Sequence, residues 1–285
     1  MERNKFLIFI FTLIVATFSA ESFAGKKQNS SKAQANPRIQ TSLVVDANSG
    51  KILHNKNAYV QVYPASLTKL MTLYVAFDHI KSGNLKLKDD LPVSLNAQNM
   101  RPCKLGLVAG QKIKTEEAIN ALIVKSANDA AVVIAEAVAG NEKNFAVLMN
   151  KTAKRLGMSN SNFMNASGWH HPEQKTTAAD LAKLTLSIKR NFPEFYPWFS
   201  KDSFNFAGKT IRGHNRVTRE YPGAEGMKTG FTNPSGFNLV TTASRDGKSL
   251  VAVVTGSDSA IGRDSKMMAL VDQKLGMITE GGFSG

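Results

Sequence analysis

Apolar residues recur at three- and four-residue steps from Ser66 to Lys81, and this spacing predicts a helix with a buried stripe. The repeating apolar positions are Leu67, Leu70, Met71, Tyr74, Val75 and Ile80. Pro64 suits the first turn of this helix, because the backbone N–H that proline lacks has no partner there. Ser66 is therefore expected in the first turn, and Lys69 lies one turn later on the same face.

Strand patterns dominate both ends of the chain, whereas the middle has helical spacing. Residues 41–46 and 51–54 flank a short turn and predict a hairpin. Further strands are expected at 204–206, 210–211, 227–229, 236–243 and 249–255, followed by a helix at 262–275. The helices expected between them are a run with Thr115 as its N-cap, and residues 127–138, 141–156 and 177–189. This order predicts an α/β part made of about residues 39–80 and 200–278, with an inserted helical part of about residues 81–199.

The first 24 residues have the pattern of a secretory signal peptide. A short basic start precedes an uncharged, mostly apolar stretch at residues 6–20, which is short for a transmembrane helix. Small residues before position 25 predict cleavage after Ala24, with an uncleaved N-terminal anchor as the alternative. Residues 25–38 are polar and are expected to form a disordered leader. We therefore expect an exported, periplasmic protein.

The net charge of +14 narrows the classes of partner. Nucleic acid, an anionic membrane surface and an acidic wall polymer all suit such a charge, but export argues against nucleic acid. Cys103 is the single cysteine, so no intrachain disulfide can form. None of the five histidines has zinc-site spacing with a glutamate, so we expect no metal and no other cofactor.

The pair Ser66 and Lys69 has the spacing of an activated nucleophile and its base. A serine hydroxyl attacks poorly until a neighbouring base takes its proton, and a lysine with a lowered pKa can do this. The start of the helix also offers N–H donors and a positive dipole end to a developing oxyanion. Ser-x-x-Lys alone is a weak signal, since Ser66 could simply be an N-terminal helix residue.

Two further short motifs strengthen this hypothesis. Lys228-Thr229-Gly230 ends a predicted strand, where a cation and a hydroxyl can hold a carboxylate and Gly230 lets a substrate backbone approach closely. Ser126 and Asn128, in Ser126-Ala127-Asn128, supply a hydroxyl and an amide just before a buried helix. Ser-x-Asn occurs elsewhere too, so Ser126 is chosen by its order and context.

The order Ser-x-x-Lys, Ser-x-Asn, Lys-Thr-Gly resembles that of penicillin-binding proteins and serine β-lactamases. The surrounding sequence is most similar to the serine-type D-alanyl-D-alanine carboxypeptidases of low molecular mass, over about residues 40–275. The segments that carry this resemblance are residues 63–72, 126–131, 165–168, 226–232 and 236–240. The resemblance implies an antiparallel sheet flanked by helices, with an inserted all-helical subdomain, in a catalytic domain of residues 39–278.

The family also implies roles for individual residues. Ser66 would attack the carbonyl of the terminal D-Ala–D-Ala bond of a peptidoglycan stem peptide, Lys69 would be its base, and Ser126 would pass the proton to the leaving amine. Asn128 would bind the substrate amide. Lys228 and Thr229 would hold the carboxylate beside Gly230, and Arg263 matches a family arginine with the same task. The backbone N–H groups of Ser66 and Phe231 would form the oxyanion hole. β-Lactam antibiotics would be covalent inhibitors.

Some features depart from the family pattern and leave alternatives open. Phe231 replaces the histidine common after Lys-Thr-Gly, and residues 169–171 are bulkier than usual. The C-terminal residues 279–285 cannot form a membrane anchor, so we expect a protein without a stable anchor.

A DD-endopeptidase acting on wall cross-links would use the same residues. A β-lactamase is disfavoured because no suitable glutamate motif lies between Asn128 and Lys228. A non-catalytic wall-binding or penicillin-sensing protein is the alternative of another class.

Overall fold

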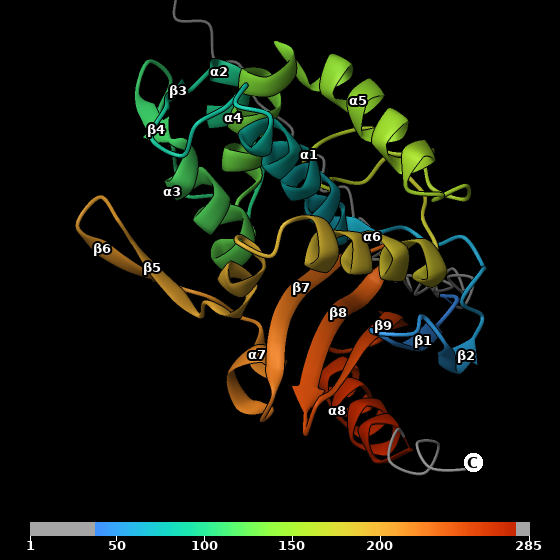
Figure 1. Cartoon of the computed structure of the whole chain (residues 1–285). Helices are drawn as coiled ribbons and strands as arrows, with labels where there is room; N and C mark the ends of the chain where they lie inside the picture. Colours follow the sequence, from blue (N-terminus) through green and yellow to red (C-terminus); the bar gives the residue numbers. More distant parts are fainter. Residues whose placement is uncertain (1–37, 278–285) are drawn as a thin grey trace, which may run out of the picture. The chain divides into compact units, whose positions relative to one another are not determined.

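The computed structural model describes residues 38–277 of the chain. The predicted signal peptide and all but the last residue of the predicted leader lie outside the described residues. Within them, a five-stranded sheet has the order β2-β1-β9-β8-β7, and every neighbouring pair is antiparallel (Figure 1). Its strands are β1 (Thr41–Asp46), β2 (Ile52–Lys56), β7 (Ala224–Thr232), β8 (Gly236–Arg245) and β9 (Lys248–Ser257). The prediction that both chain ends build one sheet is confirmed.

The central strands are apolar on both faces, because helices cover the sheet from both sides. In β9, Leu250, Ala252 and Val254 face the helix α8 (Ala260–Met277), which forms one layer. The alternate residues Val251 and Val253 belong to the larger core on the opposite face. The near-continuous apolar run of β9 therefore follows from burial on both sides.

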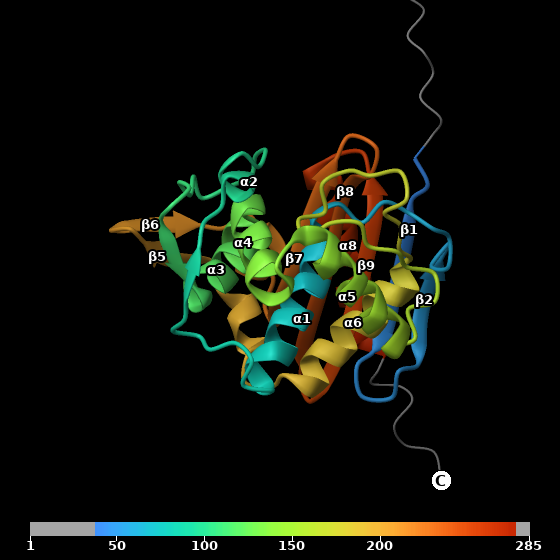
Figure 2. The same ribbon diagram turned by 90° about the horizontal axis from the view of Figure 1, so that it is seen from above.

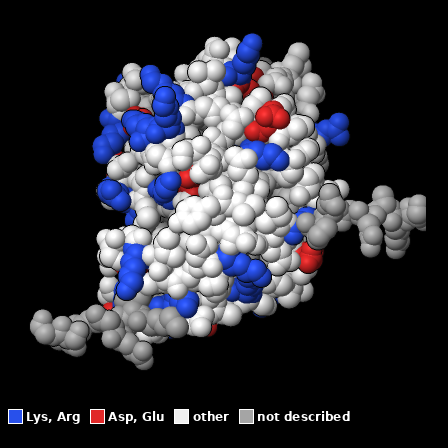
Figure 3. All heavy atoms as spheres, turned by 90° about the vertical axis from the view of Figure 1, so that its right-hand side faces the viewer, with Lys and Arg blue, Asp and Glu red and all other residues white. Residues whose placement is uncertain are grey.

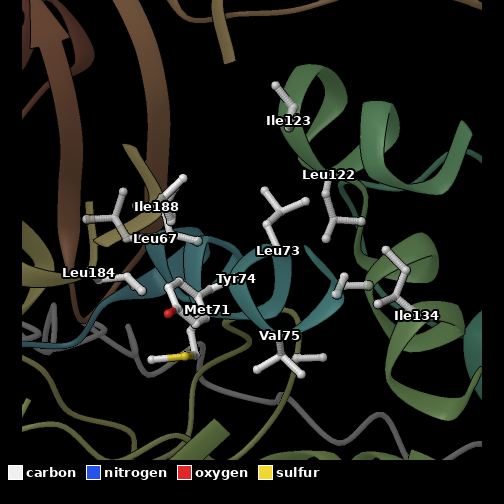
Figure 4. Packing of buried hydrophobic residues seen from close by; sticks show 14 of the residues in the cluster. Leu67, Met71, Leu73, Tyr74, Val75, Leu122, Ile123, Ile134, Leu184 and Ile188 are labelled. Atoms are coloured by element: carbon white, nitrogen blue, oxygen red, sulfur yellow. The ribbon is translucent and has the colours of Figure 1, made fainter. Parts of the chain in front are cut away.

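Helix α1 (Lys69–Lys81) lies at the centre of the larger core (Figures 1 and 2). Its first nine residues, from Lys69 to Phe77, are all buried, so the helix is enclosed on every side rather than on one stripe. Figure 4 shows Leu73 and Val75 of α1 in this core, with Leu122 and Ile134 from the helical part and Leu184 and Ile188 from α6 (Ala178–Asn191). The helix that carries Lys69 is therefore rigidly held.

The remaining helices lie mostly between α1 and β7 in the chain. The longer ones are α4 (Asn128–Ala139), α5 (Glu142–Arg155) and α6 (Ala178–Asn191). The shorter elements are η1 (Ala65–Thr68), β3 (Asp90–Pro92), α2 (Leu95–Gln98), β4 (Lys112–Lys114), α3 (Thr115–Asn120), η2 (Ala121–Lys125), η3 (Tyr196–Ser200), β5 (Ser203–Phe206), β6 (Lys209–Arg212) and α7 (Arg216–Glu220). The predicted long helices and the β5–β6 hairpin are present, with boundaries that differ by a few residues.

Two expectations need correction, and four short elements had not been expected. Thr115 is the first residue of α3, and Lys114 occupies the N-cap position, where its backbone N–H donates to the Glu117 carboxylate at 3.1 Å. Helix α6, which the sequence placed in the helical part, packs against β9 and β1. The short elements β3, α2, β4 and α7 were not anticipated, because a segment of three to five residues is too short to show periodicity.

The surface is rich in basic side chains, as the composition requires. On the face drawn in Figure 3, blue Lys and Arg side chains are widely spread and red acidic ones are fewer. Among the residues that the structure describes, no helix is long and apolar enough to span a membrane.

Candidate active site

The sequence placed Ser66 in the first turn of a helix; in the structure it lies in the 3-10 turn η1, immediately before α1. Asn238 of β8 donates to the carbonyls of Tyr63 and Pro64, both at 3.4 Å, and so joins this turn to the sheet. On the other side Gly168 packs so tightly that a Cβ there would lie 2.0 Å from the Ala65 carbonyl oxygen. The sheet and the loop at residues 165–168 therefore fix the position of the serine backbone.

Lys69 is completely buried and makes three polar contacts. Its Nζ lies 3.1 Å from Ser66 Oγ, 2.7 Å from Asn128 Oδ1 and 2.5 Å from the Ser167 carbonyl oxygen. No carboxylate accepts a hydrogen bond from Lys69 in the described part of the chain. Burial, followed by the positive charge of Lys228, holds the pKa of Lys69 well below its usual range. The structure thus favours the neutral amine at this position.

Ser126 follows a π-helix and has left-handed backbone angles, with φ 61° and ψ 34°. This conformation costs a non-glycine residue about 1–2 kcal/mol, and such strain is typical of functional positions. Here it turns the chain between η2 and α4, and Lys228 donates to Ser126 Oγ at 2.9 Å. Residues far apart in the sequence, on a helix end and an edge strand, therefore form a second Ser–Lys pair.

Lys228 is also buried, with only 2% of its surface exposed. Its Nζ donates to Ser126 Oγ and to the Thr229 carbonyl oxygen, at 2.9 and 3.0 Å. Burial lowers the pKa of Lys228 to about 7, with a smaller contribution from the positive charge of Arg263. Near neutral pH the Lys228 side chain can therefore be either an ammonium group that gives up a proton or a neutral amine that accepts one.

The Asn128 side chain makes three hydrogen bonds within the protein, besides the substrate contact that the family resemblance implies. Its Nδ2 donates to the carbonyls of Arg101 and Pro102 at 3.0 and 3.1 Å, while its Oδ1 accepts from Lys69. The next residue, Asp129, accepts from the backbone N–H groups of residues 105–107 and so fastens the same loop to α4. Both amide hydrogens of Asn128 are thus engaged, and the second lone pair of Oδ1 is what it can offer to a substrate N–H.

Gly230 on β7 lies close to the turn that carries Ser66. A Cβ at this position would lie 3.1 Å from the backbone nitrogen of Ser66 and 3.2 Å from that of Leu67. The missing side chain therefore lets the strand approach the turn that carries Ser66, and Gly230 also lines the cavity described below. The side chain of the next residue, Phe231, is 48% exposed, and its ring packs on Phe237 with centroids 4.3 Å apart.

One cavity of about 620 Å³ brings the predicted residues together. Its lining includes Ser66, Ser126, Asn128, Thr229, Gly230, Phe231 and Arg263. Lys69 and Lys228 do not line it but contact Ser66 and Ser126, which do. Arg263 is almost buried and pairs with Asp264, its Nε and one terminal nitrogen lying 2.9 and 2.7 Å from the same Oδ1. All nine residues chosen from the sequence thus belong to a single region.

Twelve further residues line the cavity, and the sequence assigned none of them a role; among them are Cys103, Ser167, Trp169 and His214. The motif Asn165-Ala166-Ser167-Gly168 was part of the resemblance, but nothing in the sequence showed that the Ser167 carbonyl would accept from Lys69. His214 was considered only as a zinc ligand. Within residues 38–277, no group of three or more His, Cys, Asp and Glu side chains could hold a metal ion.

Comparison with known proteins identifies the family. The family model described as D-alanyl-D-alanine carboxypeptidase, Peptidase S11, matches residues 27–259. The chain is 35% identical over 236 residues to D-alanyl-D-alanine carboxypeptidase DacD of Escherichia coli K12, which covers 80% of this chain and 61% of the relative. It is 27% identical over 265 residues to DacF of Bacillus subtilis 168, covering 91% of this chain and 68% of the relative. The chain thus spans about three fifths to two thirds of the length of these relatives.

Solved structures show the same fold. The D-alanyl-D-alanine carboxypeptidase DacD from Francisella tularensis superposes with a TM-score of 0.79 and 31% identity, over 82% of this chain and 70% of that one. Penicillin-binding protein D2 from Listeria monocytogenes, in its cefotaxime-bound form, gives a TM-score of 0.71 and 27% identity, over 81% of this chain and 95% of that one. The predicted fold class is confirmed. The motifs, the match of the family model and these relatives agree, and the chain belongs to the D-alanyl-D-alanine carboxypeptidase family.

Proposed function

We propose that this protein is a serine DD-carboxypeptidase that removes the terminal D-Ala from peptidoglycan stem peptides through an acyl-enzyme on Ser66. The observation that carries the proposal is the contact between Ser66 Oγ and the buried Lys69 Nζ, at 3.1 Å. The lowered pKa of Lys69 supports its role as the base, because only the neutral amine can take a proton.

The other two contacts of Lys69 set the direction of proton transfer. A neutral amine has two N–H groups and one lone pair. The Asn128 Oδ1 and the Ser167 carbonyl oxygen can only accept, so they take both N–H groups. The lone pair is then left for the Ser66 hydroxyl, whose O–H donates to Nζ. Attack on the substrate carbonyl moves this proton to Lys69.

Departure of D-Ala requires a proton on its amine nitrogen, and we assign its delivery to Ser126. Because Lys228 donates to Ser126 Oγ, the Ser126 hydroxyl hydrogen remains free to move to the leaving group. The ammonium of Lys228, with a pKa of about 7, stabilises the transient negative charge on this oxygen and can restore its proton. The proton that Lys69 took from Ser66 then passes through solvent to the neutral Lys228, which restores both side chains. Water hydrolyses the acyl-enzyme with the neutral Lys69 again as base, and its proton goes to the departing Ser66 oxygen.

Substrate binding is assigned to β7 and to the cationic end of the cavity. β7 is the last strand of the sheet, and no further described strand pairs with it, so an extended peptide can add along its edge. Thr229, Lys228 and Arg263 would hold the terminal carboxylate, and Asn128 Oδ1 would accept from a substrate amide. The backbone N–H groups of Ser66 and Phe231 would bind the oxyanion. Gly230 lies close to the Ser66 backbone, since a Cβ built on it would be 3.1 Å from the Ser66 nitrogen. This proximity supports the assignment of the Ser66 and Phe231 N–H groups to one oxyanion hole.

Two further assignments belong to the same proposal. We expect β-lactams to acylate Ser66, as suggested by the Listeria relative, whose structure is described as a cefotaxime-bound form. We also propose export to the periplasm with cleavage after Ala24, based on the sequence of residues 1–24.

The test is release of D-alanine from an N-acylated peptide ending in D-Ala-D-Ala. The mature protein should release it, and Ser66→Ala should abolish the release. The matched control Ser82→Ala removes a surface hydroxyl that donates to the His79 carbonyl and should keep full activity. Absence of D-alanine release by the wild-type protein would refute the proposal and leave the DD-endopeptidase and the non-catalytic wall-binding protein as the remaining hypotheses.

A DD-endopeptidase is the second candidate, because one relative has that name. The D-alanyl-D-alanine endopeptidase of Pseudomonas aeruginosa PAO1 is 30% identical over 223 residues, covering 75% of this chain and 70% of the relative. A cross-linked muropeptide dimer distinguishes the two activities. Faster cleavage of the dimer than of the D-Ala-D-Ala peptide would favour the endopeptidase.

A further inference from the structure

His214 contacts the hydroxyl of the Lys-Thr-Gly motif. Its Nε2 lies 3.0 Å from Thr229 Oγ1, and its side chain lines the same cavity as Arg263. The three residues come from different elements: His214 from the segment between β6 and α7, Thr229 from β7, and Arg263 from α8. Nothing in the sequence motifs assigns a role to this histidine.

The backbone on both sides of His214 is firmly packed. Gly213 donates to the Asp202 carbonyl at 2.6 Å, and a Cβ on Gly213 would lie 3.2 Å from the Val124 carbonyl oxygen. On the other side, Val217 of α7 is fully buried in the core beneath the sheet. The contact between His214 and Thr229 is therefore set by packed backbone and not by a free loop.

The Thr229 hydroxyl has a single hydrogen, which decides what the contact can do. If His214 accepts that hydrogen, Thr229 has none left for a substrate carboxylate. If the Nε2–H of His214 donates, Thr229 Oγ1 accepts it and keeps its own hydrogen for the substrate. The hydrogen bond from the imidazole also polarises the Thr229 hydroxyl, which strengthens the hydrogen bond from that hydroxyl to the substrate carboxylate.

The surroundings of His214 keep its imidazole neutral. Partial burial, followed by the positive charges of Lys228, Arg263, Lys125 and Lys69, lowers the pKa of His214 to about 4. At neutral pH the ring therefore contributes one N–H donor and no charge. Cationic residues already supply the positive charge that a carboxylate needs. His214 therefore contributes the orientation of the Thr229 hydroxyl hydrogen.

We propose that His214 is a positioning residue for the C-terminal carboxylate of the substrate: its Nε2–H donates to Thr229 Oγ1 and directs the Thr229 hydroxyl hydrogen to that carboxylate. The inference rests on the proposed carboxypeptidase function and deepens it. It names the residue through which the site would select a free carboxylate over an uncharged peptide end.

The test compares two substrates that differ only at the C-terminus. One is an N-acylated peptide ending in D-Ala-D-Ala with a free carboxylate, and the other is the same peptide with a C-terminal amide. The matched variants are His214→Met and His214→Gln, which have similar length and flexibility but differ in the N–H donor. His54→Phe is the control, because His54 Nε2 also contacts a hydroxyl, Ser42 Oγ at 2.8 Å, but does not line the cavity.

His214→Met should lower kcat/KM for the carboxylate peptide about tenfold, mainly through KM, which corresponds to about 1.4 kcal/mol for one charge-assisted hydrogen bond. The amide peptide should change less than about twofold, since its carbonyl oxygen accepts only a weaker hydrogen bond between neutral groups. His214→Gln should recover most of the loss, and His54→Phe should leave the ratio of the two substrates unchanged.

An equal loss for both peptides in His214→Met, no loss for either, or no recovery in His214→Gln would overturn the inference. If the wild-type protein cleaves the carboxylate peptide, the proposed function stands whatever the variants do. If the wild-type protein cleaves neither peptide, the proposed function fails and the role of His214 falls with it.

Discussion

Lys228 Nζ lies 2.9 Å from Ser126 Oγ, so one hydrogen bond joins the edge strand of the sheet to the helix end that precedes α4. The same lysine lowers the pKa of Lys69, second only to burial. Lys228 therefore acts on both serines of the site. It donates a hydrogen bond to Ser126, and its positive charge lowers the pKa of Lys69, which contacts Ser66.

The first prediction concerns the pH dependence of acylation in Lys228→Gln. Acylation needs neutral Lys69, so its rate falls as the pH drops through the pKa of Lys69. Removing the positive charge of Lys228 lets that pKa rise, and the acid limb of the profile should move to higher pH. Stopped-flow acylation by a chromogenic β-lactam measures this limb. Lys104→Gln removes an exposed cation that donates to the Gln98 carbonyl and should leave the limb in place. A limb that does not move in Lys228→Gln would contradict the coupling.

The second prediction concerns Ser126→Gly. Loss of the hydroxyl should slow acylation about 10²- to 10⁴-fold, the usual contribution of a proton-transfer group. Stability should not fall, because glycine adopts the left-handed backbone of Ser126 without strain. Acylation kinetics and thermal unfolding of the same preparation check both parts. Acylation at the wild-type rate would show that another group protonates the leaving amine.

The third prediction concerns Gly230→Ala. The added Cβ would lie 3.1–3.2 Å from backbone atoms of Pro64, Ser66 and Leu67, which cannot rotate away. We expect a loss of about 1–3 kcal/mol in unfolding free energy, as in an overpacked core, together with slower acylation because the Ser66 turn is displaced. Urea unfolding gives the first quantity.

Gly50→Ala is the control for Gly230→Ala. Gly50 has a positive φ of 74° and no atom within 4 Å of an added Cβ, so Gly50→Ala should cost about 1–2 kcal/mol without affecting acylation. Unchanged acylation in Gly230→Ala would show that the close approach is not needed for the position of Ser66.

The fourth prediction concerns Glu142, whose carboxylate accepts from the Ala166 backbone N–H at 3.2 Å beside the Ser167 contact of Lys69. Burial raises the pKa of Glu142, so this carboxyl binds its proton more tightly in the folded protein than in the unfolded chain. The stability that this carboxyl contributes is therefore present at low pH and lost as the pH rises through its folded-state pKa. Glu142→Gln mimics the protonated form and should be more stable than wild type at pH 8, with little difference at pH 4. The reverse order in urea unfolding would contradict this assignment.

The sequence predicted the main elements and the grouping of the candidate site residues for a physical reason. The strands β1, β8 and β9 are apolar runs long enough to stand out from the turns beside them, the helices α1 and α6 are long enough to repeat apolar residues at helical spacing, and the three motifs are short and local. Their order allowed nine residues to be placed in one site, and the described structure brings all nine together.

What the sequence could not predict depends on contacts between distant segments. The Ser167 carbonyl and the His214 imidazole acquire their partners only when the chain folds, because a carbonyl exists at every residue and a lone histidine has no fixed spacing to Thr229. Gly230 shows the same limit: the motif identified the glycine, but only the fold shows that it faces Ser66.

The most direct test of the acyl-enzyme mechanism is the intact mass of the protein after incubation with benzylpenicillin, followed by peptide mapping. The account predicts an increase of one penicilloyl group, located on the peptide that contains Ser66, and no adduct in Ser66→Ala. Rapid loss of the drug without an adduct would instead indicate a β-lactamase. Neither an adduct nor drug turnover would contradict the account, because the Ser66–Lys69 pair would then not be a working nucleophile and base.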